Sequence, residues 1–148
     1  MYQSLLAACL LVATTIGAAI GSAAAHEVAE KVTPALQQSI PNIPGKSLIA
    51  VTVDYPPGAA SLPHLHAKSA FIYAYVLSGA IESQVNDGPT QFLRAGDSFY
   101  EPPGARHLVS RNASKTEPAK LLAVFVLDTG DTPLTTPIPH PGKTEKSQ

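Results

Sequence analysis

The sequence has little charge and almost no cysteine. Only 14% of its 148 residues are charged, the formal net charge is −1, and no stretch clusters lysine or arginine with aromatic residues. Without a basic field the chain has no electrostatic means of holding a phosphate backbone, so nucleic-acid binding is disfavoured. The one cysteine, Cys9, lies in the apolar N-terminal stretch. The rest of the chain therefore has no disulfide, thiolate metal site or cysteine nucleophile, and a metal ion must use histidine, carboxylate or tyrosine ligands.

The first 25 residues also lack Asp, Glu, Lys and Arg, and they are mostly apolar before ending in Ala23-Ala24-Ala25. Small residues after a short apolar run are typical of a signal-peptidase site. We therefore predict a signal peptide over residues 1–25, cleavage before His26, and a periplasmic or secreted protein. Because the usual positive residues are missing, an uncleaved membrane anchor is the alternative, although a spanning helix needs about 20 apolar residues. Lipidation of Cys9 is a further alternative.

The 14 prolines disfavour long helices, because proline removes a backbone donor and breaks a helix interior. Short runs of β-type residues alternate instead with turn signals such as Asn86-Asp87-Gly88-Pro89 and Pro102-Pro103-Gly104. The predicted strands cover residues 47–55, 70–77, 80–85, 91–93, 98–100, 107–111 and 120–127. Repeated short strands predict an all-β fold, an antiparallel barrel or sandwich.

One barrel domain is expected over residues 47–128. Residues 26–46 are predicted to form an N-terminal arm, irregular except for a short helix around residues 35–39. Residues 129–148, rich in proline and polar at the end, are predicted to form a flexible tail.

Three histidines carry the candidate site. His64 and His66 are two residues apart, so in an extended segment both imidazoles point to the same face and can meet at one ion. His107 follows a segment that begins at Gly96 and turns at residues 102–104.

These two segments resemble the paired motifs of the cupin superfamily. The first motif is matched by Gly58, His64, His66 and Gly79, and the second by Gly96, Pro102, Gly104 and His107. The resemblance implies a double-stranded β-helix, or jelly-roll barrel, in which His64, His66 and His107 bind one divalent metal ion. Iron is the first expectation, with manganese, nickel, copper or zinc as alternatives. The family also implies a homodimer and a small-molecule ligand or substrate.

The chain departs from the first motif at its glutamate. Counting back from Gly79 places Ile72 at that position, whereas counting forward from His66 places Phe71 there, so one residue is extra. A bulge over residues 68–70 would turn Ile72, Ala74 and Val76 inward; without it, Phe71, Tyr73 and Tyr75 would face inward. We favour the bulge, which leaves Tyr73 as a packing residue rather than a ligand or proton donor.

Glu101 is the best replacement carboxylate and our candidate catalytic residue. It precedes Pro102, which holds it extended, in the hairpin that delivers His107. There it could ligate the ion or act as a general base. The alternative is a carboxylate at the rim that pairs with Arg106 or Arg111.

Two classes of function are consistent with this site. One is a metal-dependent enzyme of dioxygenase, lyase or isomerase type that acts on a small organic molecule. The other is a non-catalytic module that binds a metal or small ligand for sensing, storage or scavenging. The vacant glutamate position leaves both open.

Overall fold

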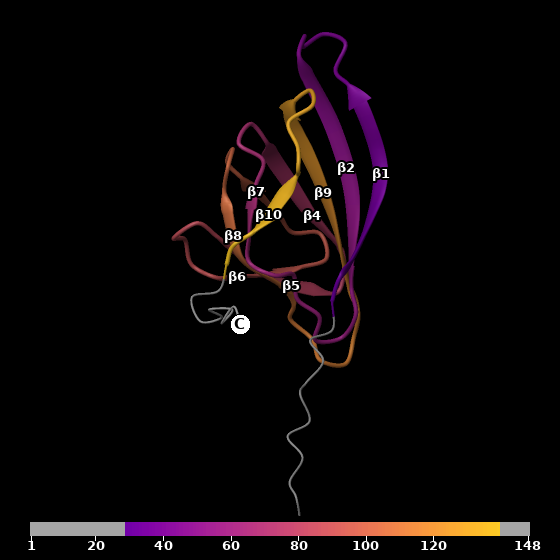
Figure 1. Ribbon diagram of the computed structural model, residues 1–148. Coiled ribbons are helices and arrows are strands. Elements are labelled where there is room, and N and C mark those ends of the chain that lie inside the picture. The colour runs from indigo at the N-terminus through magenta and orange to yellow at the C-terminus, as the bar shows by residue number, and fades with distance from the viewer. Residues whose placement is uncertain (1–28, 140–148) are drawn as a thin grey trace, which may run out of the picture.

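The computed structural model describes residues 29–139, which form two packed β-sheets (Figure 1). The predicted signal peptide, Cys9 and His26 lie outside the described residues. Within 29–139 no helix is long and apolar enough to cross a membrane. The strands are β1 (Lys31–Ser39), β2 (Lys46–Tyr55), β3 (His64–His66), β4 (Phe71–Ser78), β5 (Ala80–Val85), β6 (Gln91–Arg94), β7 (Ser98–Glu101), β8 (Arg106–Asn112), β9 (Ala119–Asp128) and β10 (Thr135–Pro137).

Each sheet has five strands. The first sheet has the order β1-β2-β9-β4-β7 and the second the order β10-β3-β8-β5-β6. All strand pairs are antiparallel. The expected all-β, antiparallel architecture is confirmed.

The core lies between the two sheets and follows the two-residue period of the strands. Along β9, buried residues alternate with partly exposed ones from Ala119 to Leu127. One face of the strand therefore packs inward while the other faces outward. The inward face of β9 includes Leu121 and Phe125, and these pack against residues of β2 and β4.

The structure decides which face of β4 points inward. Ile72 and Val76 are fully buried, whereas Phe71 and Tyr73 are each 43% exposed. The predicted inward face is confirmed. The extra residue does not form a strand bulge, however: it is absorbed in a turn before β4, where the Ala70 amide donates to the Ala67 carbonyl at 3.0 Å.

Residues 31–39 form strand β1, so the predicted short helix in this segment is wrong. β1 lies at the edge of the first sheet beside β2 (Figure 1). Pro34 is tolerated there because an edge strand does not need every amide and the register shifts between Pro34 and Leu36. Pairing with a distant strand thus overrode the weak local signal.

Strand β10 lies within the segment predicted as a flexible tail. It pairs with β3, with Thr135 opposite His66 and Pro137 opposite His64. The second sheet therefore ends in a strand that lies directly beside two of the candidate ligands. Residues 140–148 lie outside the described part of the chain.

Candidate metal centre

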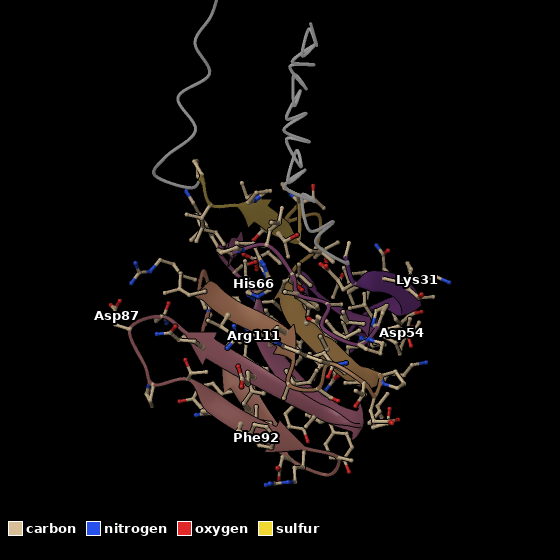
Figure 2. All side chains as sticks on the ribbon, turned by 90° about the horizontal axis from the view of Figure 1, so that it is seen from below. Lys31, Asp54, His66, Asp87, Phe92 and Arg111 are labelled. Carbon is tan, nitrogen blue, oxygen red and sulfur yellow. The ribbon has the colours of Figure 1, made fainter. Side chains whose placement is uncertain are left out.

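The three predicted histidines meet in the interior. His64 and His66 begin and end β3, and His107 on β8 lies opposite His64. One ring nitrogen from each histidine lies within 4.8 Å of the others. Figure 2 shows His66 in the middle of the molecule and Asp87 on an outer loop. Two neighbouring strands therefore form a cluster that could hold one ion.

Glu101 joins this cluster from the other sheet. It lies on β7 directly opposite Ile72 of β4, and opposite residues of paired strands project from the same face. The Glu101 side chain is 3% exposed; its Oε2 lies 2.9 Å from His66 Nε2 and its Oε1 lies 3.3 Å from His107 Nδ1. The carboxylate thus reaches the histidines from the strand next to the position where the motif has its glutamate.

Glu101 is not a rim carboxylate. The two arginines considered as its partners bind other acids: Arg106 pairs with Asp87 at 2.6 Å and Arg111 with Glu82. Both pairs are at the surface, whereas Glu101 is buried. The alternative in which Glu101 pairs with Arg106 or Arg111 is therefore wrong.

Burial sets the protonation of the cluster. Burial lowers the pKa of His107 to about 4, because the nearby Glu101 only partly offsets the loss of solvation. Burial likewise lowers the pKa of His64. For Glu101, burial raises the pKa, but the three imidazoles together lower it more, and the net shift is downward. At neutral pH, His64 and His107 are therefore neutral and Glu101 is a carboxylate, which are the forms that bind a metal.

The imidazole rings of His64 and His107 each have a hydrogen-bonding partner outside the cluster. His64 Nδ1 donates to the Leu62 carbonyl at 2.7 Å, which leaves its Nε2 with a free lone pair. His107 Nε2 lies 2.9 Å from the hydroxyl of Ser83. Such outer partners orient histidine ligands and raise their basicity.

Other polar atoms of the cluster have no hydrogen-bond partner among the described residues. These are both ring nitrogens of His66 and Oε2 of Glu101, although Oε2 lies close to Nε2 of that ring. A buried polar atom without a partner costs about 1–3 kcal/mol. A divalent ion would bind one ring nitrogen of His66 and the Glu101 oxygen, and three imidazoles with one carboxylate suit a first-row metal. The residues present therefore fit a metal ion.

A cavity of about 670 Å³ borders the cluster. Its lining includes the three histidines, Glu101 and Ile72, together with apolar residues of β2 and β9. Phe99 is half-buried and its ring lies 6.0 Å from that of His107, whereas Tyr100 is 64% exposed. Phe99 is thus the inward aromatic residue of β7.

Comparison with known proteins agrees with this geometry. Residues 51–125, half of the chain, match the family model described as a cupin domain. The chain belongs to the cupin family. This cupin is 33% identical over 97 residues to the "Putative germin-like protein 9-2" of Oryza sativa subsp. japonica, a match that covers 64% of this chain and 44% of that protein. It thus spans less than half the length of that relative.

Solved structures share the fold of this cupin at low identity. A double-stranded β-helix protein from Klebsiella pneumoniae has a TM-score of 0.56 at 22% identity, covering 70% of this chain and 80% of its own. An oxalate oxidase in complex with the substrate analogue glycolate has a TM-score of 0.54 at 22% identity, covering 74% and 61%. At such identities the likeness shows the fold alone.

Two residues of this cupin, Asn112 and Ser83, make buried contacts that the sequence motifs do not predict. Asn112 is buried and its amide donates to the carbonyls of Tyr55, Pro56 and Glu117. It joins the end of β2 and Glu117 to β8. Asn112-Ala113-Ser114 has the form of a glycosylation sequon, but the Asn112 side chain is buried in the folded chain. Ser83 was not predicted at all, because no local signal marks a serine that lies beside a histidine 24 residues away.

Proposed function

We propose that this cupin binds one divalent metal ion through His64, His66 and His107, with Glu101 as the fourth ligand, and acts as a metal-dependent enzyme on a small organic molecule. Iron is the first expectation, and manganese, nickel, copper or zinc are alternatives. The observation that carries the proposal is the buried Glu101 carboxylate, which lies beside two imidazoles in a cavity that no described lysine or arginine lines. An ionised carboxylate in such a place requires a positive partner.

A bound metal would supply Lewis acidity and orient an oxygen of the substrate. The chain itself places Glu101 on the wall of the cavity, within reach of both the cluster and a molecule bound there. Its carboxylate is therefore the group placed to accept a proton from the substrate.

The cavity favours an enzyme over a sealed binding module. A role limited to holding an ion would be supported by Phe71, Ile72 and Phe99 closing over it. Phe71 instead projects outward and is 43% exposed. A cavity of about 670 Å³ remains beside the cluster, within the range of ligand-binding sites.

Metal analysis beside activity measurements tests this proposal. We expect about one equivalent of divalent metal in the wild type and little in His107→Ala, with O₂ uptake or turnover on members of a panel of phenols, diketones and organic acids. Glu82→Gln is a control, because it removes a carboxylate that pairs with Arg111 at the surface. Equal metal content in wild type and His107→Ala would overturn metal binding at this cluster.

We also propose that the protein is exported and forms a homodimer. The composition of residues 1–25 supports export, and mass spectrometry of the mature protein should find His26 at its N-terminus. A mature chain that retains Met1 would contradict cleavage. Exposed aromatic residues on the outer face of the first sheet support the dimer.

A further inference from the structure

Two clusters of polar side chains line the cavity beside the histidines, together with Glu30 and Thr135. The first is the cluster of histidines with Glu101. The second is formed by Tyr55, Ser61 and Ser110. Most of the remaining lining is apolar and includes Val51, Val53, Leu121, Phe125 and Leu134. A ligand that fills this space would therefore contact a mostly apolar surface that carries these two polar clusters.

Tyr55, Ser61 and Ser110 form a hydroxyl cluster. The Tyr55 hydroxyl lies 2.9 Å from Ser61 Oγ and 2.7 Å from Ser110 Oγ. Burial of Tyr55 raises its pKa despite these two bonds, so the phenol stays protonated at neutral pH. Three hydroxyl groups carry three hydrogens, and the two contacts use two of them. Among the described residues these hydroxyls make no further side-chain hydrogen bond, so one O–H donor of the hydroxyl cluster is left for a ligand.

The charges around the cavity disfavour an anionic ligand. Among the described lining residues the charged side chains are Glu30 and Glu101, with no lysine or arginine. A divalent ion would therefore be offset by two carboxylates, which leaves no excess positive charge. A dianion such as oxalate would add two negative charges to a buried site whose ion is already offset by Glu30 and Glu101, and such uncompensated charge is costly. An uncharged ligand meets no such cost.

We propose that the hydroxyl cluster is a second polar subsite, and that the ligand is an uncharged, mostly apolar molecule with one oxygen for the metal and a second polar group for this subsite. The first contact rests on the proposed metal binding. The second depends only on Tyr55, Ser61 and Ser110. The two parts of the inference can therefore fail separately.

Calorimetric titration of the zinc-loaded protein tests the ligand class, because zinc has no redox chemistry. The probes are 2-naphthol, dihydroxynaphthalene isomers without adjacent hydroxyls, and oxalate. We expect the best-fitting diol to bind about five-fold more tightly than 2-naphthol, the effect of one added hydrogen bond. Oxalate should bind more weakly than 2-naphthol.

Two variants test whether the tighter binding of the diol comes from the hydroxyl cluster. Ser110→Ala and Tyr55→Phe should remove the advantage of the diol while leaving 2-naphthol binding and zinc content unchanged. Ser47→Ala is the matched control, because its hydroxyl pairs with Thr129 outside this cavity. Thermal unfolding of each variant shows that it is folded.

The outcomes separate this inference from the proposed function. The inference is overturned if no diol binds more tightly than 2-naphthol, if the gain survives both variants, or if oxalate binds best. If the wild type takes up no zinc, metal binding fails instead. The metal-free protein then still tests the subsite, because the diol should keep its advantage over 2-naphthol there.

Discussion

Glu101 on β7 lies directly opposite Ile72 on β4, and both side chains project from the same face of the first sheet. Ile72 stands where the first motif of the family has glutamate, so this cupin carries its carboxylate one strand away. The Glu101 carboxylate still lies beside the histidines, because opposite residues in an antiparallel pair have Cβ atoms only about 5 Å apart.

Because Ile72 and Glu101 lie opposite each other, we predict that a carboxylate at position 72 can partly replace the one at position 101. Glu101→Gln should lower metal affinity at least about ten-fold, since it removes a charged donor that the cluster needs. Adding Ile72→Glu to Glu101→Val should recover part of that affinity, because the new carboxylate starts from the neighbouring position on the same face. Zinc titration against a competing chelator measures both effects.

Two results would count against this role of Glu101. One is a Glu101→Gln protein with wild-type zinc affinity. The other is a double variant that binds no better than Glu101→Gln although its circular dichroism matches the wild type. Glu82→Gln, which removes a carboxylate outside the cluster, should bind zinc as the wild type does.

Ser83 should matter for the metal through its contact with His107, although it is not one of the candidate ligands. Its hydroxyl lies 2.9 Å from His107 Nε2 and both groups are buried. Ser83→Ala should weaken metal binding by roughly ten- to a hundred-fold, the usual effect of losing a partner that orients a histidine ligand. Unchanged zinc affinity in Ser83→Ala, with Ser47→Ala as the control, would show that the contact has no such effect.

The histidine cluster was predictable from the sequence because its spacing is local. Residues two apart on a strand share a face, and the turn after Glu101 delivers His107 to the same region. Seven strand segments were also found, because turn residues separate them. The pairing of Ile72 with Glu101 was not predictable, because register between distant strands depends on packing across the whole sheet.

Strand β1 shows what local signals miss. Its residues are exposed along the whole strand, so no two-residue alternation of burial marks it. Its structure comes from pairing with β2 through a register that shifts near Pro34. Strand β10 is similar, since its three residues gain their structure from β3 alone.

Asn112 should be a structural residue and not a glycosylation site. Asn112→Ala would leave the carbonyls of Tyr55, Pro56 and Glu117 without this donor, which should lower the free energy of unfolding by roughly 2–4 kcal/mol. Arg111→Ala removes an exposed ion pair and should cost less than about 1 kcal/mol. Urea unfolding compares the two variants, and equal losses would contradict the assignment.

Asp131 should stabilise the position of the segment that leads into β10. Its Oδ2 accepts hydrogen bonds from the Ser69 amide at 3.0 Å and the Ser69 hydroxyl at 2.6 Å. Asp131→Asn should therefore speed hydrogen exchange at the Ala67 and Ile138 amides, which bond to Leu134 and Pro63 beside this segment. Exchange at the β4–β9 pair should stay unchanged. Equal exchange at Ala67 and Ile138 in both proteins would contradict the role of Asp131.

The contact between Asp131 and Ser69 should depend on pH. The bonds from Ser69 lower the pKa of Asp131 below its ordinary 3.8, so the folded state favours the ionised form. The stabilisation is then fully present above pH 3.8 and is lost as the pH falls through the lowered pKa. Exchange at Ile138 should show this loss in the wild type, after correction for the intrinsic rate, and should not show it in Asp131→Asn.

The outer face of the first sheet should be the surface through which two copies pair. Phe71, Tyr73 and Tyr100 are 43%, 43% and 64% exposed, and the rings of Phe71 and Tyr100 stack at 5.8 Å. Exposed apolar groups gathered on one face are typical of an interface. Tyr73→Glu should therefore convert a dimer into a monomer in light scattering after size exclusion. Phe92→Glu, on the second sheet, should remain dimeric, and a monomeric wild type would refute the pairing.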